Sequence, residues 1–226
     1  MIIIGVGVNA RRAFYFIKDY NLFNIVGFAV NSEYYSDSEF LDNPVYRLEH
    51  LHDQIETPFK VFVALLWNRL NHDRRKLYEY CEDKGYEFAN LISPHSIIRS
   101  NSMIGKNCWI NDYVLLQNDV KIGDNVVAMP YSTVETNSNV GSHTFIGSKA
   151  LVGGGCEVGE QCFLGFNSVI FDSTRVGNKC IVGACTAVKR NLPDFSRIIV
   201  SENSMQTCIY TGNEIETKLE HTKNRR

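Results

Sequence analysis

The sequence predicts a chain of two parts, a small mixed α/β domain at the N-terminus followed by an all-β parallel helix of short strands. Two observations predict this architecture. Large aliphatic residues recur at every sixth position through the middle of the chain, and strand, glycine-turn and helix patterns alternate before residue 91. We expect the α/β domain over 1–91, the β-helix over 92–200 and a partly disordered extension over 201–226.

The composition is that of an ordinary globular chain. Its 226 residues are 44% hydrophobic and carry a formal net charge of −2. So small a charge creates no field that would recruit nucleic acid, and no apolar run reaches the roughly 20 residues of a membrane span. Seven cysteines without CxxC pairs or histidines at ligand spacing predict reduced thiols and no metal site. The absence of a signal-peptide pattern predicts a cytoplasmic protein.

The strongest pattern is a six-residue register in which sixteen of seventeen positions are Ile, Leu or Val. The residues four places after the first sixteen of these positions are all small or β-branched. Residues six apart do not share a helix face, whereas short parallel strands around a narrow triangular core need large and small side chains in this alternation. Three such strands make a coil of eighteen residues. The register positions are Ile92, Ile98, Ile104, Ile110, Leu116, Ile122, Ala128, Val134, Val140, Ile146, Val152, Val158, Leu164, Ile170, Val176, Val182 and Val188.

The residues between the expected strands fit tight corners. Asn and Gly tolerate the left-handed backbone conformation that tight corners favour. One corner position of the six-residue unit is repeatedly filled by these two residue types, so we expect positive φ angles there. The residues are Asn101, Asn107, Asn125, Asn137, Gly155 and Asn167.

Residues 1–90 alternate between strand and helix patterns. Strands are expected at 1–4, 25–30, 60–65 and 87–91, and helices at 11–20 and 74–84. Gly5 and Gly7 lie between the first strand and the first helix, an arrangement that directs backbone N–H groups at a phosphate. Taken alone this is a weak indication, because the third glycine of the dinucleotide motif and an acidic end to the second strand are missing. A tight turn without a ligand is the alternative.

The six-residue register resembles the hexapeptide repeat of left-handed β-helix acyltransferases. The N-terminal segment is similar to that of bacterial sugar acyltransferases, which include sialic-acid O-acetyltransferases and nucleotide-sugar N-acetyltransferases. The matching pieces are 2–5, 27–28, 44–45, 66–68 and 84–86. This resemblance implies a left-handed β-helix, a Rossmann-like nucleotide-sugar-binding domain, and a homotrimer with active sites between neighbouring prisms. It also implies acetyl-CoA as co-substrate and a role in surface glycan biosynthesis.

The resemblance further implies site residues. The nucleotide sugar would contact Gly7, Asn31, Trp67 and Asn68, with Asn31 standing where an aspartate is common. Acetyl-CoA would contact Gly154, Phe145, Phe166, Ala184 and Lys189. Catalysis is expected around Thr136 and Asn137, but Thr136 replaces the general-base histidine of the family, and Phe145 replaces a second family histidine. A hydroxyl cannot hold a proton near neutral pH.

Three explanations for the missing base stay open. His143, one corner further along, could supply the base, although it occupies a slot that asparagines fill elsewhere. Alternatively, the acceptor is an amine that arrives neutral or loses its proton to water, and the enzyme only orients it. In the third explanation the chain has lost catalysis. The leading hypothesis is therefore an acyl-CoA-dependent transferase for a nucleotide-linked amino sugar, and the rival is a binding or scaffold protein.

Overall fold

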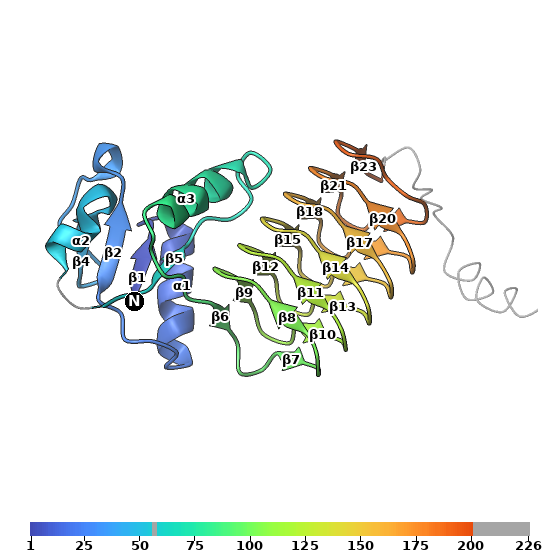
Figure 1. Cartoon of the computed structure of the whole chain (residues 1–226), viewed down its shortest axis with the longest axis horizontal. Coiled ribbons are helices and arrows are strands. Elements are labelled where there is room, and N and C mark those ends of the chain that lie inside the picture. Colours follow the sequence, from blue (N-terminus) through green and yellow to red (C-terminus); the bar gives the residue numbers. More distant parts are fainter. Residues whose placement is uncertain (56–57, 201–226) are drawn as a thin grey trace, which may run out of the picture.

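The computed structural model describes residues 1–55 and 58–200 (Figure 1), so the extension expected at 201–226 lies outside the described residues. A small N-terminal α/β domain precedes a left-handed parallel β-helix, and the predicted fold class is confirmed. Within the described ranges, no helix is long and apolar enough to cross a membrane.

The N-terminal domain is built on a five-stranded sheet of order β3-β4-β2-β1-β5, in which only β3 runs antiparallel to its neighbour. Helix α1 packs on one face of this sheet, while α2 and α3 pack on the other. The strands are β1 Ile2–Ile4, β2 Gly27–Val30, β3 Glu39–Phe40, β4 Asn43–Arg47 and β5 Val61–Val63. The helices are α1 Val8–Asp19, α2 Leu51–Gln54 and α3 His72–Asp83, with short η1 Ser32–Tyr34 and η2 Leu48–His50.

The sheet differs from the sequence prediction at two places. The strand expected at 87–91 is wrong, because Phe88 forms only an isolated bridge with Val61, and Leu91 already belongs to the first strand of the β-helix. Strands β3 and β4 were not foreseen. Pro44 lies inside β4 and has no N–H group to donate, which argues against a strand when only the sequence is read.

The β-helix winds once every eighteen residues. Each strand pairs in parallel with the strand one coil later, as Leu115 does with Thr133, and the strands form three faces. Face 1 contains β7 Ile97–Ile98, β10 Leu115–Leu116, β13 Thr133–Val134, β16 Leu151–Val152, β19 Val169–Ile170 and β22 Ala187–Val188. Face 2 contains β8 Met103–Ile104, β11 Lys121–Ile122, β14 Asn139–Val140, β17 Glu157–Val158 and β20 Arg175–Val176. Face 3 contains β6 Leu91–Ile92, β9 Trp109–Ile110, β12 Val127–Ala128, β15 Phe145–Ile146, β18 Phe163–Leu164, β21 Ile181–Val182 and β23 Arg197–Ile198.

The register side chains fill the interior of the prism, as the six-residue pattern predicts. From Ile110 to Val188 they are buried in one cluster, together with small residues such as Cys108 and Cys156. The six corner residues expected to have positive φ angles have values between 53° and 64°. The sequence pattern therefore specifies both the interior and the corners of this part.

Three edges separate the faces, and each edge is a column of corners. Edge 1–2 joins faces 1 and 2 at 117–120, 135–138, 153–156, 171–174 and 189–192. Edge 2–3 joins faces 2 and 3 at 105–108, 123–126, 141–144 and 159–162. Edge 3–1 joins faces 3 and 1 at 111–114, 129–132, 147–150, 165–168 and 183–186. Because the cross-section is a triangle, edge 1–2 lies opposite face 3.

The N-terminal domain packs on face 3 and on edge 2–3. The ring of Trp109 on face 3 contacts Phe62 of β5 edge-on, at 5.8 Å between centroids. On edge 2–3, Asn107 accepts a hydrogen bond from the backbone N–H of Val63 at 2.8 Å and donates one to Asn125 at 2.8 Å. The prism therefore partners a backbone group on the outer strand β5, which would otherwise be an open sheet edge.

His143 ends this column of polar side chains. Its Nδ1 lies 3.0 Å from Nδ2 of Asn125, and its carbonyl oxygen accepts a hydrogen bond of 2.8 Å from Nη2 of the fully buried Arg74 in α3. Burial lowers the pKa of His143 to about 4, and the neighbouring Arg75 and Arg74 act in the same direction. A neutral ring can accept a hydrogen bond from the Asn125 amide group, and the bond from Arg74 to the His143 carbonyl joins the prism to α3.

The close stacking of coils makes glycine necessary at Gly141 but not at Gly154. A methyl group on Gly141 would lie 2.6 Å from the carbonyl carbon of Gly159, whereas one on Gly154 meets only the carbonyl oxygen of Thr136 at 3.6 Å. We expect Gly141→Ala to lower the free energy of unfolding by about 2 kcal/mol, because backbone would have to move. Gly154→Ala should be close to neutral. Urea unfolding followed by circular dichroism at equal protein concentration checks both, and equal stability of the two variants would contradict the packing described.

The buried His143 should make stability fall in acid. The unfolded chain takes up a proton near pH 6.5 and the folded chain only near pH 4, so the unfolded state binds more protons between these values. We expect this residue to remove on the order of 2 to 3 kcal/mol of stability between pH 7 and pH 4. His143→Asn, which suits the positive φ of 63°, should flatten this dependence in urea unfolding at a series of pH values. Parallel pH profiles of the two proteins would refute this account.

Candidate functional site

The N-terminal domain contains a pocket of about 820 Å³ beyond the carboxyl ends of β1, β2 and β5. This crevice is where open α/β sheets bind ligands. Gly5 turns the chain out of β1 with a φ of 119°, and Gly7 is the N-cap residue of α1 without a side-chain cap. The first N–H groups of the twelve-residue helix therefore face the pocket, as a site for an anion requires.

Helix α3 forms one wall of the pocket. Asp73, Lys76, Leu77 and Tyr80 recur at three- and four-residue spacing on the face that lines it. Arg69, just before the helix, donates a hydrogen bond of 2.9 Å from Nε to Oδ1 of Asp73. Lys76 is exposed and forms no ion pair with any described residue. Lys76 therefore offers a positive charge to an anionic ligand, although the carboxylates of Asp73 and Glu33 also line the pocket.

The opposite face of α3 touches the prism. Arg74 and Tyr78 of this face pack against edge 2–3, where the Tyr78 ring contacts the His143 ring at 5.4 Å. The turn before the helix holds three consecutive residues, Arg69 to Asn71, in the left-handed conformation, and Nδ2 of Asn71 donates a hydrogen bond to the carbonyl of Cys162 at 2.8 Å. One helix and its leading turn thus contact both the pocket and the prism.

Three of the four residues expected to bind a nucleotide sugar line this pocket. They are Gly7, Asn31 and Asn68. Trp67 instead packs edge-on against Phe145 at 5.0 Å and is 40% exposed. Sequence reasoning missed Arg69 and Lys76, although Arg69 directly follows Asn68 and Lys76 could have been found from the phase of the predicted helix.

The expected catalytic residues separate onto two edges. Thr136 and Asn137 are exposed on edge 1–2, and the carbonyl oxygen of Thr136 accepts a hydrogen bond from the N–H of Gly155 at 2.9 Å. His143 lies on edge 2–3 with 7% exposure, beneath α3. This placement favours the interpretation of His143 as a corner residue, because a base must reach the acceptor.

The residues expected to bind acetyl-CoA lie on three parts of the prism. Gly154 and Lys189 stand on edge 1–2, while Phe166 and Ala184 stand on edge 3–1, and these two edges border face 1. Phe145 is different. It has no exposed surface and stacks between β-helix and domain, 5.2 Å from the Phe163 ring. A fully buried side chain cannot touch a cofactor in this conformation, so its expected role needs correction to that of a core residue.

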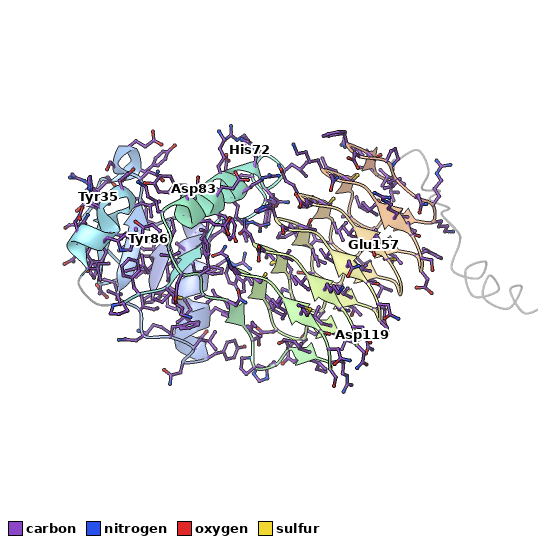
Figure 2. All side chains as sticks on the ribbon, viewed as in Figure 1. Tyr35, His72, Asp83, Tyr86, Asp119 and Glu157 are labelled. Atoms are coloured by element: carbon purple, nitrogen blue, oxygen red, sulfur yellow. The ribbon has the colours of Figure 1, made fainter. Side chains whose placement is uncertain are left out.

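The pocket and edge 1–2 lie apart within one chain. The N-terminal domain covers face 3 and edge 2–3, which leaves edge 1–2 on the opposite side of the prism. In Figure 2, Asp119 marks edge 1–2 and lies well away from α3, which runs from His72 to Asp83. Among the described residues, no group of three or more His, Cys, Asp or Glu side chains could hold a metal ion.

Sequence models of two repeat families match the prism. The bacterial transferase hexapeptide (six repeats) matches residues 101–136, 119–154 and 137–172, and the hexapeptide repeat of succinyl-transferase matches 155–190. No curated protein sequence is significantly similar to the chain.

Solved structures share the fold of both parts. PerB from Caulobacter crescentus, in complex with CoA and GDP-perosamine, is 26% identical with a TM-score of 0.76 over 87% of this chain and 91% of that one. A histidine-to-asparagine variant of perosamine N-acetyltransferase from the same organism is 24% identical, with a TM-score of 0.77 over 87% and 91%. The acetyltransferase domain of PglB from Neisseria gonorrhoeae, in complex with acetyl coenzyme A, is 19% identical, with a TM-score of 0.75 over 87% and 93%.

These matches bear on the resemblance seen in the sequence. They cover the α/β domain together with the β-helix, and the repeat models coincide with the coils from 101 to 190. The resemblance to hexapeptide-repeat sugar acyltransferases is therefore confirmed, and the prism of this chain carries the hexapeptide repeat of bacterial transferases.

Proposed function

We propose that this chain is an acyl-CoA-dependent acyltransferase, with acetyl-CoA as co-substrate and an amino sugar carried on a nucleotide as acceptor, in surface glycan biosynthesis. The observation that carries the proposal is the likeness over 87% of the chain to PerB, whose structure holds CoA and GDP-perosamine. We assign nucleotide binding to 1–91 and acyl transfer to 92–200.

The pocket of the N-terminal domain suits the diphosphate of a nucleotide sugar. The open N-terminus of α1 offers backbone N–H donors and a favourable dipole. Lys76 and Arg69 add positive charge at the pocket wall, and Tyr34 and Tyr80 offer aromatic rings on which a base could stack. Asn31 replaces the acidic residue that often contacts a ribose, which leaves the choice of nucleotide to the rest of the pocket.

A homotrimer would complete the site. In one chain, the residues proposed to contact acetyl-CoA lie on edges 1–2 and 3–1, and the pocket lies away from edge 1–2. Neighbouring prisms can place edge 1–2 of one copy against edge 3–1 of the next, which gathers Gly154 and Lys189 with Phe166 and Ala184. Gly154 leaves room for a pantetheine arm to approach the backbone.

The transfer itself joins the amine nitrogen to the acetyl carbonyl carbon and breaks the carbon–sulfur bond of the thioester. Thr136 can orient the acceptor by hydrogen bonding but cannot take its proton. Holding a neutral amine against the thioester can supply several kcal/mol of the barrier reduction. Thr136 also favours the alternative proposal, a non-catalytic binding or scaffold protein with the same two ligand sites.

A shift of the melting temperature on adding ligand tests whether the chain binds acetyl-CoA and a nucleotide sugar, as both proposals require. We expect acetyl-CoA and GDP-perosamine each to raise the melting temperature by several degrees at about 100 times Kd, because both bind only the folded state. Acetate and mannose serve as controls. The enzyme must in addition release CoA thiol when both ligands are present. Binding without thiol release, across GDP-, UDP- and dTDP-linked amino sugars, would leave the scaffold proposal, and no shift with any acyl-CoA would reject the transferase.

The contribution of Lys76 to nucleotide binding can be measured directly. We expect Lys76→Ala to weaken binding of GDP by about three- to tenfold at low salt, since one cation near a phosphate is lost. Lys121→Ala is the matched control, because Lys121 is exposed on face 2 of the prism and does not line the pocket. Isothermal titration calorimetry provides both values. Equal affinities of the two variants would mean that the phosphates lie elsewhere.

A further inference from the structure

A carboxylate is held on edge 1–2 beside the residues expected to carry out catalysis. Asp172 stands one coil beyond Gly154 and two coils beyond Thr136 in the same column of corners. Its Oδ1 accepts a hydrogen bond from the N–H of Gly154 at 2.9 Å. The side chain is exposed, and its Oδ2 has no hydrogen-bond partner among the described residues.

The glycines below Asp172 leave the space in front of the carboxylate open. Gly154 has no side chain, so nothing projects from the corner between Thr136 and Asp172. Backbone hydrogen bonds from Gly155 to Thr136 and from Ser173 to Gly154 hold the three coils in register, at 2.9 and 2.8 Å. Neighbouring coils are about 5 Å apart. The Asp172 carboxylate leans back to the level of Gly154, one coil from Thr136, so a small group such as an amine fits between the side chains of Asp172 and Thr136.

Other carboxylates fit this position less well. Glu135 precedes Thr136 and is partly buried, and no hydrogen bond to a described residue fixes its side chain. Asp119 lies one coil before Asn137, on the side of Thr136 away from Gly154 and Lys189. His143 is beneath α3 on another edge. Asp172 alone combines a fixed orientation with proximity to Gly154.

We infer that Asp172 is a catalytic residue that contacts the acceptor amine and receives its proton. This inference rests on the proposed function. The amine nitrogen attacks the carbonyl carbon, the carbon–nitrogen bond forms, and the carbon–sulfur bond breaks with its electron pair on sulfur. The surplus proton of the amine passes to Oδ2 of Asp172 and then to the thiolate of CoA, which leaves as the free thiol. No further reactant is needed.

A second aspartate of the prism, Asp194, accepts a backbone hydrogen bond in the same way as Asp172 and provides a matched control. Asp194 accepts a hydrogen bond from the N–H of Asn178 at 2.8 Å, in the column of corners that continues edge 2–3. Its Oδ1 accepts the same backbone hydrogen bond as that of Asp172, but its Oδ2 also accepts one from Nδ2 of Asn178 at 3.2 Å, and it stands on a different edge from Thr136. A purely structural role would therefore make Asp194 at least as important as Asp172, whereas catalysis concerns Asp172 alone.

The test compares Asp172→Asn with Asp194→Asn in the full chain. An asparagine oxygen can still accept the backbone hydrogen bond but cannot carry the proton, so folding should be kept in both. With acetyl-CoA and GDP-perosamine, we expect kcat of Asp172→Asn to fall about 100-fold or more. KM for acetyl-CoA and the melting temperature should stay near those of the wild type. Asp194→Asn should stay within about threefold of the wild-type rate.

Each contrary outcome has a distinct meaning. An active wild type with an unchanged Asp172→Asn variant removes this inference and leaves the proposed function. Equal losses in both variants reduce Asp172 to a structural cap. A faster Asp172→Ala variant would show that the carboxylate blocks the Gly154 N–H group instead of assisting transfer, and would also overturn the inference. A wild type that binds both ligands but releases no thiol removes the proposed function and this inference together.

Discussion

The parallel pairing of strands one coil, or eighteen residues, apart is the constraint on which the rest of the structure depends. Each coil must lie directly on the one before it, so corner residues align in columns along three edges. The corner residues of one column share the same solvent exposure only where the N-terminal domain does not cover that column. The N-terminal domain covers edge 2–3 and face 3, which makes Asn107, Asn125 and His143 interior residues, whereas residues at equivalent corners of edge 1–2 remain exposed.

The β-helix could be predicted almost completely, because its pattern is local and repeated. A six-residue period fixes which side chains point inward, and the Asn and Gly corners mark the turns, so interior and corners follow without knowledge of distant contacts. The α/β domain was less accessible. Strand β4 contains Pro44 and was missed, and the segment around Phe88 has strand-like residues but forms a single bridge because the chain is already turning into the prism.

The candidate site was predictable only in part. The family resemblance named Gly7, Asn31 and Asn68, and these residues line one pocket because parallel strands end at the same side of a sheet. The burial of His143 depends on Arg74, 69 positions earlier, which no local pattern reveals. Phe145 likewise looks like any outward strand residue until a domain packs over it. Long-range packing, not local sequence, determined which of these side chains remain available to a ligand.

The two-sided contact of α3 has an evolutionary consequence. A change on its prism side would disturb the buried Arg74, and the left-handed turn from Arg69 to Asn71 tolerates few replacements without strain. The backbone of that wall is therefore fixed against the prism, and only its pocket-facing side chains, such as Lys76, are free to change. A change of nucleotide that requires the backbone to move is easier on the other wall, where Asn31 and Tyr34 follow strand β2.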